Sequence, residues 1–266
     1  MKSCRLSLMS LSLVVAFLAP VGYCDEVRFI TEPTTSMDTE GRSFSNESEL
    51  TRELIQRLNQ TNDIEVYPWR RAYSIMQSEP NVALFPTTRT EARENDAKWV
   101  GPLLKVRWVM YAHKDSDIEL NNLEDAKKVP QICGYLGDAK LAFLEKNGFE
   151  NIETQYRSFD CIKLLARKRV DLWISSANAL LWDIQADRDY LSDIKIVYTI
   201  DTKYLYYAVS KETSDETVNL LQETLNTMKK EGAFYKYYSK DFSDETIKEF
   251  SKVEQPDFPW ITADNK

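Results

Sequence analysis

The chain has 266 residues, of which 43% are hydrophobic, and this is enough for one large domain or for two lobes with separate cores. Its formal net charge is −8 at neutral pH, and it contains no long basic run. An acidic chain of this kind excludes nucleic acid from the expected partners. The single histidine, His113, excludes metal clusters and catalytic dyads that are built on pairs of histidines.

Residues 1–24 have the pattern of a cleaved signal peptide. Lys2 and Arg5 precede an apolar segment at 6–20 that is too short to cross a bilayer comfortably. Gly22 and Cys24 provide small residues at the −3 and −1 positions for cleavage after Cys24. Acylation of Cys24, as in a lipoprotein, is the alternative, but Tyr23 is bulky for such a site. We therefore expect an exported protein.

Short apolar strands alternate with amphipathic helices in the first block of the chain. Strands are predicted at 27–31, 64–67 and 82–85. Leu50, Leu54 and Leu58 recur every four residues in a helix that Ser45 or Asn46 caps, and Pro68 opens a second, shorter helix. This alternation predicts a mostly parallel sheet covered by helices.

The same alternation continues in a second block. Strands are predicted at 107–113, 131–135, 152–156, 170–174, 194–199 and 204–209, and helices at 140–147, 159–168, 177–187, 214–231 and 233–239. Gly148 and Gly232 mark helix ends. Beyond Asp244 the chain is charged and poorly periodic as far as the segment 256–260.

Two cysteines, Cys133 and Cys161, remain after cleavage of the signal peptide. An even pair in an exported protein predicts a disulfide, and two buried free thiols are the alternative.

The segment that follows the strand at 82–85 has the character of a binding site. Thr88, Arg89 and Arg93 come directly after this apolar run, and a Trp-Val-Gly-Pro segment follows at 99–102. Open α/β sheets bind small molecules at strand ends, and a guanidinium can hold a carboxylate with two parallel hydrogen bonds. The alternative is a solvated loop in which Glu91 and Glu94 pair with the arginines.

The spacing of three residues is typical of a known family: Thr88 at a strand end, Arg93 five residues later and Pro102 nine residues after the arginine. In this pattern the chain resembles the family 3 extracellular solute-binding proteins, the amino-acid-binding type of periplasmic receptor. Segments 132–142, 164–174 and 206–211 match later parts of the same pattern. The resemblance implies an α/β, two-lobed periplasmic binding protein type II fold with mostly parallel sheets and two crossing hinge strands. Residues 25–105 and 205–266 would form the first lobe and 106–204 the second, with hinges near 103–107 and 202–206.

The resemblance also implies which residues bind the ligand. Arg93 and Thr88 would hold a carboxylate, Trp69 would form a wall and Glu32 would face the ligand. The helix-opening turn at Gly137 and Ala139 would offer backbone N–H groups to an anion, with Asp138 as the helix cap. The alternatives are interhelical packing for Trp69, pairing with Arg70 or Arg71 for Glu32, and an ordinary helix start for the turn.

One departure from the family concerns the ammonium group of an amino acid. The family places an acidic residue after the strand at 170–174, whereas this chain has Ser175 and Ser176, with Asn178 just beyond. A serine supplies no charge. Either Glu32 or Asp160 takes this role, or the ligand lacks an α-ammonium group.

We therefore expect a periplasmic protein that binds a small polar, anionic or zwitterionic solute for an ABC-type importer. No enzymatic activity, metal or cofactor is expected, and the expected state is a monomer whose partners are inner-membrane transporter subunits or a membrane sensor. A dehydratase-like enzyme and a sensory ligand-binding module are the alternatives, since a fold does not fix function.

Overall fold

The computed structural model describes residues 26–33, 45–177, 190 and 192–261. Within these ranges eight strands form one sheet in the order β2-β1-β3-β8-β4-β7-β5-β6. The strands are β1 (Arg28–Thr31), β2 (Glu65–Val66), β3 (Val82–Thr88), β4 (Lys98–His113), β5 (Ile132–Tyr135), β6 (Ile152–Gln155), β7 (Leu172–Ser176) and β8 (Ile194–Val209). The helices are α1 (Asn46–Arg57), α2 (Trp69–Ser78), the 3-10 helix η1 (Glu91–Asp96), α3 (Leu123–Ala126), α4 (Ala139–Lys146), α5 (Ser158–Ala166), α8 (Asp215–Lys230), α9 (Ala233–Tyr238) and α10 (Asp244–Phe250).

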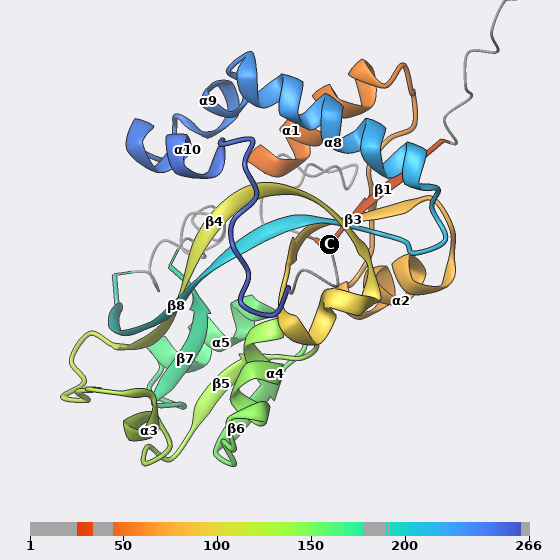
Figure 1. The fold of residues 1–266 in the computed structure, drawn as a ribbon. Helices are drawn as coiled ribbons and strands as arrows, with labels where there is room; N and C mark the ends of the chain where they lie inside the picture. The colour runs from red at the N-terminus through yellow and green to blue at the C-terminus, as the bar shows by residue number, and fades with distance from the viewer. Residues whose placement is uncertain (1–25, 34–44, 178–189, 191, 262–266) are drawn as a thin grey trace, which may run out of the picture.

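Two long strands connect the halves of the molecule. β4 and β8 pair antiparallel from Lys98 opposite Val209 to His113 opposite Ile194, and Figure 1 shows them running side by side between the upper and lower groups of helices. We call this pair the ribbon. The sequence-based prediction of a short strand at 107–113 and of two strands at 194–199 and 204–209 is wrong in extent. The polar residues at 201–203 suggested a break, but they lie in mid-strand with partly or fully exposed side chains, where β4 supplies the backbone hydrogen bonds.

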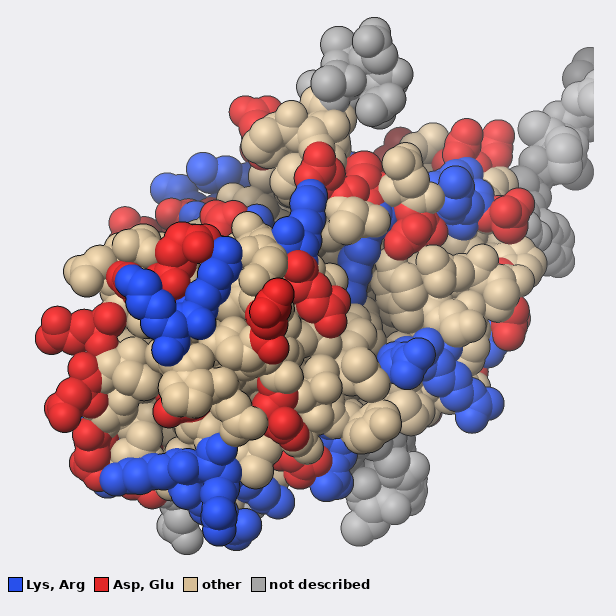
Figure 2. Space-filling view, turned by 90° about the horizontal axis from the view of Figure 1, so that it is seen from below, with Lys and Arg blue, Asp and Glu red and all other residues tan. Residues whose placement is uncertain are grey.

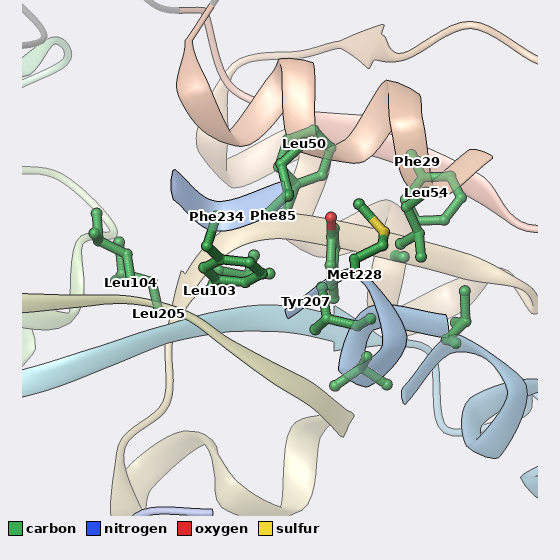
Figure 3. Close-up of a cluster of buried hydrophobic side chains, with 14 of the residues drawn as sticks. Phe29, Leu50, Leu54, Phe85, Leu103, Leu104, Leu205, Tyr207, Met228 and Phe234 are labelled. Atoms are coloured by element: carbon green, nitrogen blue, oxygen red, sulfur yellow. The ribbon is translucent and has the colours of Figure 1, made fainter. Parts of the chain in front are cut away.

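The first lobe has parallel pairs of β1 with β2 and with β3, and its main helices α1, α8, α9 and α10 cover one face (Figure 1). Ser45 caps α1 by accepting a hydrogen bond from the Ser48 N–H, so of the two expected caps Ser45 is the one that forms. Leu50 and Leu54 are fully buried on this helix, as their spacing predicts. Figure 3 shows the apolar cluster that they form with residues from the sheet, α8 and α9: Phe29, Phe85, Leu103, Leu104, Leu205, Tyr207, Met228 and Phe234.

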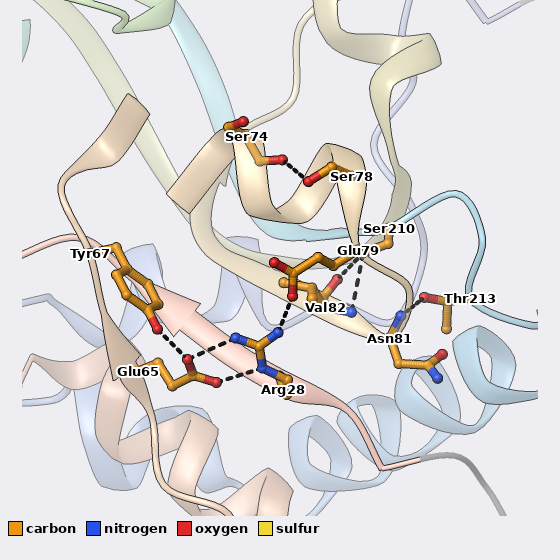
Figure 4. A network of polar contacts seen from close by, with 10 residues as sticks. All are labelled: Arg28, Glu65, Tyr67, Ser74, Ser78, Glu79, Asn81, Val82, Ser210 and Thr213. Carbon is orange, nitrogen blue, oxygen red and sulfur yellow. Dashed lines mark hydrogen bonds and ion pairs between the residues drawn. The ribbon is translucent and has the colours of Figure 1, made fainter. Parts of the chain in front are cut away.

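Arg28, at the start of β1, joins three elements near the outer edge of this lobe (Figure 4). Its guanidinium holds the Glu65 carboxylate of β2 with contacts of 2.7 and 2.9 Å, and it also pairs with Glu79 at the end of α2. The Tyr67 hydroxyl donates to the same Glu65 carboxylate. Hydrogen bonds from Arg28 hold the pKa of Glu65 below its usual value, although burial opposes them. The network fixes β1, which Glu32 follows, and α2, which begins at Trp69.

In the second lobe β5 pairs parallel with β6 and β7, and β7 pairs antiparallel with β4. Cys133 of β5 and Cys161 of α5 form a disulfide with Cα atoms 5.6 Å apart, which confirms the predicted pairing. Both sulfurs belong to a buried apolar cluster between β5, β7 and α5.

The C-terminal segment is more ordered than its composition indicated. α10 forms where no periodic element was expected, with Ser243 as its cap and Ile247 and Phe250 fully buried. The chain then passes across the ribbon, as the dark blue trace in Figure 1 shows. Gln255 donates to the Gly101 carbonyl at 2.7 Å and accepts from the Tyr206 hydroxyl at 3.1 Å. This segment therefore bonds to β4 and β8 together.

Several expectations fall on residues outside the described ranges: the signal peptide at 1–24, most of the helix expected at 177–187, and Asn178. Among the described residues, no helix combines the length and the apolar character that crossing a membrane requires. On the face shown in Figure 2, Lys and Arg side chains are interspersed with Asp and Glu side chains.

Candidate functional site

A cavity of about 530 Å³ lies between the two lobes, and we call it the cleft. Pockets of about 300–1,000 Å³ are typical of small-molecule sites. The first lobe contributes Glu32, Pro33, Ser45, Glu47, Pro68, Trp69, Pro86, Thr88, Arg93 and Leu205. The second lobe contributes Tyr135, Asp138, Lys140, Tyr156, Arg157, Ser158, Phe159, Ser175 and Ser176.

Six of the eight predicted ligand-binding residues line the cleft: Arg93, Thr88, Trp69, Glu32, Ser175 and Ser176. The other two, Gly137 and Ala139, line a neighbouring cavity of about 650 Å³ that shares Trp69 and Arg93 with the cleft. Ala139 is also 5% exposed and belongs to an apolar cluster of the core. The structure thus brings most of the predicted set to one place and puts the helix-opening turn beside it.

The hydroxyl groups of the cleft come from strand ends. Thr88 is the last residue of β3 and lies opposite Leu205 of β8. Ser175 and Ser176 end β7, where Ser176 lies opposite Trp108 of β4. All three residues are buried. Because both strands end next to the ribbon, hydroxyl-bearing residues from distant parts of the sequence line the same cavity.

The carbonyl oxygen of Gly137 receives two hydrogen bonds from the first lobe. Trp69 donates through Nε1 at 2.9 Å, and Arg93 donates through Nη2 at 3.0 Å. Gly137 has a φ of +86°, and a side chain there would be strained and would also press against Arg70 and Trp69, so the position favours a glycine. The Gly137 carbonyl of this turn therefore connects it to the other lobe, and the expected use of the turn's N–H groups for a ligand stays a prediction.

Arg93 also packs against two neighbouring aromatic rings. Its guanidinium carbon lies 5.3 Å from the centre of the Trp69 ring and 5.2 Å from that of Tyr73. No carboxylate pairs with Arg93 among the residues that the structure describes. The direct contacts of the guanidinium are therefore with neutral groups, and the Asp138 carboxylate, whose pKa the charge of Arg93 helps to lower, is itself paired with Lys140.

A second link between the lobes involves Glu32, which follows β1. The Tyr135 hydroxyl of β5 donates to Glu32 Oε2 at 3.1 Å. Burial, and then the nearby Glu32 carboxylate, raise the pKa of Tyr135 far above its usual value, so this hydroxyl remains a donor. Glu32 thus takes part in joining the lobes.

Asp138 and Lys140 form an ion pair in the second-lobe wall, with Nζ and Oδ2 2.7 Å apart and both side chains largely buried. Asp138 also caps α4 by accepting from the Lys140 N–H at 3.0 Å, as the sequence indicated. Burial would raise the pKa of Asp138, but the Lys140 ammonium and these hydrogen bonds outweigh it and leave the pKa below its usual value. The two charges cancel locally.

Two further charged residues named from the sequence lie outside the cleft. Arg89 holds Glu94 with contacts of 2.9 and 2.5 Å, and its guanidinium packs against Trp99, Tyr206 and Phe258. Asp160 pairs with Arg157 three residues earlier and does not line the cavity. Of the two acids named as substitutes for the family's acidic residue, only Glu32 lines the cleft.

Glu47 is a cleft residue that the sequence reasoning missed. It lies in the first turn of α1, is 2% exposed, and lines the cavity. Its Oε1 atom is buried without a hydrogen-bond partner among the described residues. In sequence, an acid in the first turn of a helix indicates an exposed partner of the helix dipole. The burial of Glu47 follows from the packing around α1, which local sequence does not show.

Comparison of the sequence with protein-family models and with curated proteins gives no match. Among solved structures, a histidine kinase sensor domain with similarity to periplasmic binding proteins superposes with a TM-score of 0.72 at 19% identity, over 80% of this chain and 95% of that one. An ancestral arginine-binding protein bound to arginine gives 0.69 at 18% identity, over 82% and 98%. The chain has the periplasmic binding protein fold.

A third similar structure is a putative binding component of an ABC transporter from Wolinella succinogenes, complexed with lysine. It gives a TM-score of 0.70 at 16% identity, over 82% of this chain and 96% of that one. The expected two-lobed type II architecture is thus confirmed, and the resemblance to family 3 is confirmed at the level of the fold. The ribbon is the connection between the two lobes.

Proposed function

We propose that this chain is an exported solute-binding protein that captures a small polar solute between its two lobes. The observation that carries the proposal is the cleft itself, since Arg93 and Thr88 enter it from one lobe and Ser175, Ser176 and Lys140 from the other. Neither half encloses a solute alone, so affinity depends on closure of the lobes. Similar structures that hold arginine or lysine support this assignment.

The proposed solute is anionic or zwitterionic, because Arg93 lines the cleft without a carboxylate partner among the described residues, whereas the other cleft arginine, Arg157, pairs with Asp160. The present acceptor of Arg93, the Gly137 carbonyl, is neutral. A carboxylate forms stronger, charge-assisted hydrogen bonds with a guanidinium, so a bound solute can compete for this donor. Thr88 would supply a hydroxyl beside it.

The same proposal has three further parts: the protein resides in the periplasm, it delivers the solute to an ABC-type importer, and it releases the solute without converting it. Native mass spectrometry of freshly purified protein tests it, because a retained solute appears as an added mass. A solute recovered unchanged after incubation supports a binding protein. A solute recovered as a different compound contradicts it and supports the dehydratase-like alternative.

A sensory role is the second candidate function, because one of the similar structures is a histidine kinase sensor domain. The two roles share the cleft and differ in the partner that recognises the closed form. Cross-linking of the solute-loaded protein in membranes distinguishes them, since the importer role predicts adducts with transporter subunits and the sensory role predicts adducts with a kinase.

A further inference from the structure

The cavity of about 650 Å³ beside the cleft has no part in the proposed function, and we call it the side chamber. It shares only Trp69 and Arg93 with the described lining of the cleft. Both of these side chains donate to the Gly137 carbonyl, and Gly137 lines the side chamber alone. The side chamber and the cleft are therefore two sites that share one wall.

The walls of the side chamber come from both lobes. The first lobe contributes α2 and η1, the second lobe contributes α4, and the ribbon contributes Trp108 and Lys203. Lys146 of α4 pairs with Glu91 of η1 at 3.1 Å, and both residues line the chamber. A small molecule in the chamber would therefore contact both lobes.

Aromatic rings from four separate parts of the chain line the side chamber: Trp69 and Tyr73 of α2, Trp108 of β4, Phe143 of α4, and Trp260. The ring centres of Trp69 and Tyr73 are 5.8 Å apart, and so are those of Trp108 and Phe143. Rings that served only the core would fill the space between them, because protein interiors leave few voids larger than a water molecule. A cavity of this size among aromatic side chains is typical of a small-molecule site.

The charged side chains of the chamber are mostly positive. Six of them line it: the cations Arg70, Arg93, Lys146 and Lys203, and the acids Glu91 and Asp96. Asp201, which does not line the chamber, pairs with Lys203, and the sum stays positive when Asp201 is counted. An excess of positive charge around aromatic rings favours an anion over a cation.

Arg70 is the cation of the chamber that is free to bind an anion. Lys146 and Lys203 each pair with an acid, and Arg93 donates to the Gly137 carbonyl. Arg70 is exposed in the first turn of α2 and makes no ion pair among the residues that the structure describes. Its side chain reaches the other lobe, since a methyl group on Gly137 would lie 3.1 Å from Cγ of Arg70. The guanidinium thus borders the chamber where the lobes meet.

We propose that the side chamber is a second binding site, which takes a small molecule with an aromatic ring and an anionic group, such as an aromatic carboxylate. The ring packs against Trp108 and Phe143, where offset or edge-to-face contacts between rings are favourable. The carboxylate pairs with Arg70, whose planar guanidinium can donate two parallel hydrogen bonds to it. This site is additional to the cleft, so capture of a solute in the cleft does not depend on it.

Calorimetric titration of the full mature chain tests the two parts of the proposed ligand separately. Indole-3-acetate and phenylacetate carry a ring and a carboxylate. Tryptamine carries the indole ring with an amine in place of the carboxylate, and acetate carries the carboxylate without a ring. A preference for the first two probes over both others identifies an aromatic anion as the ligand class.

Two variants locate the bound probe in the side chamber. Ala142 is an exposed residue of α4 that lines the chamber and not the cleft, so Ala142→Trp fills the chamber without disturbing the core. Glu145→Trp is its matched control, because it adds the same side chain at an exposed position of α4 that lines neither cavity. Arg70→Gln removes the proposed anion-binding charge, and Arg71→Gln is the control at its exposed neighbour. A thermal melt of each variant verifies folding.

We expect indole-3-acetate or phenylacetate to bind about tenfold or more tightly than tryptamine and acetate, since neither of these offers both groups. Ala142→Trp and Arg70→Gln should each weaken this binding by about tenfold or more, whereas Glu145→Trp and Arg71→Gln should bind as the wild type does. If the probe also occupies the cleft, the wild type should show two sites and Ala142→Trp one.

Three results would overturn the inference. They are the absence of binding by both aromatic carboxylates, tighter binding of tryptamine, and binding that Ala142→Trp leaves unchanged, which would place the probe outside the side chamber. Each of these results leaves the proposed function intact, because native mass spectrometry tests capture of a solute in the cleft separately.

Discussion

Nη2 of Arg93 lies 3.0 Å from the carbonyl oxygen of Gly137, so the guanidinium expected to hold a solute also connects the two lobes. Trp69 donates to the same oxygen, and Tyr135 reaches back to Glu32 from the second lobe. Three of the side chains expected to bind the solute therefore also connect the lobes.

Replacement of Arg93 should weaken binding while leaving the fold intact. Arg93→Ala removes a charge-assisted contact, and the loss of one partner of a buried charged pair costs about 2–5 kcal/mol. Arg93→Lys should restore little, because an ammonium cannot reproduce the guanidinium fork. Calorimetry with the solute identified by mass spectrometry measures the effect. Arg71→Ala is the control, since Arg71 is an exposed arginine of α2. Unchanged affinity in Arg93→Ala would remove this arginine from the site.

Trp69→Phe should favour the open form of the unliganded protein. The substitution keeps an aromatic ring and removes the N–H that bonds to Gly137, a contribution of about 0.5–1.5 kcal/mol to closure. Small-angle scattering should show a larger radius of gyration than in the wild type. Tyr67→Phe is the matched control, because it also removes one side-chain donor from an aromatic residue and the Tyr67 hydroxyl bonds to Glu65 within the first lobe. Equal profiles for Trp69→Phe and the wild type would show that this bond does not govern closure.

The Cys133–Cys161 bond should contribute measurably to stability. It closes a loop with a sequence separation of 28 residues. The chain-entropy model gives about 3–4 kcal/mol for a loop of this size, although that model is disputed. The Cys133→Ala/Cys161→Ala double variant should therefore melt at a lower temperature. Thiol titration of the denatured, non-reduced mature protein should detect no free thiol, and two reactive thiols would refute the pairing in the isolated protein.

Lys229 should make stability depend on pH in the alkaline range. It is 6% exposed, its Nζ donates to the Lys252 carbonyl at 3.0 Å, and burial lowers its pKa to about 7 from 10.5 although Glu254 opposes this shift. Below pH 7 both states carry the proton, so the cost of the buried charge is present in full. Between pH 7 and 10.5 the unfolded chain binds more protons than the native one, so the free energy of unfolding rises with pH.

Lys229→Met should consequently stabilise the protein near pH 7 by up to a few kcal/mol (about 1.4 per pKa unit), and it should flatten the rise of stability with pH. Urea unfolding at several pH values measures both effects. Lys230→Met, at an exposed neighbour on α8, is the control. A Lys229→Met variant that retains the slope of the wild type would assign the pH dependence to another group.

The sequence predicted those features that depend on local periodicity or on a recognisable spacing. Leu50 and Leu54 predicted the buried face of α1, and Thr88 and Arg93 predicted a strand end beside a cavity. The length of β8 was not predictable from local sequence. The polar residues at 201–203 have a composition typical of turns, but pairing with β4 holds them in the strand. Glu47 was missed for a related reason, since its burial depends on α9, almost two hundred residues later in the chain.

The segment that crosses the ribbon has a consequence for engineering of this protein. Gln255 bonds to Gly101 and Tyr206, and Trp260 donates to Glu94 at 3.1 Å, which in turn holds Arg89. None of these residues lines the cleft. The resistance of the ribbon to bending should therefore depend partly on contacts made outside the cleft. Substitutions in residues 255–260 can retune how readily the lobes open and close while every group that touches the solute stays the same, so affinity and specificity can be adjusted separately.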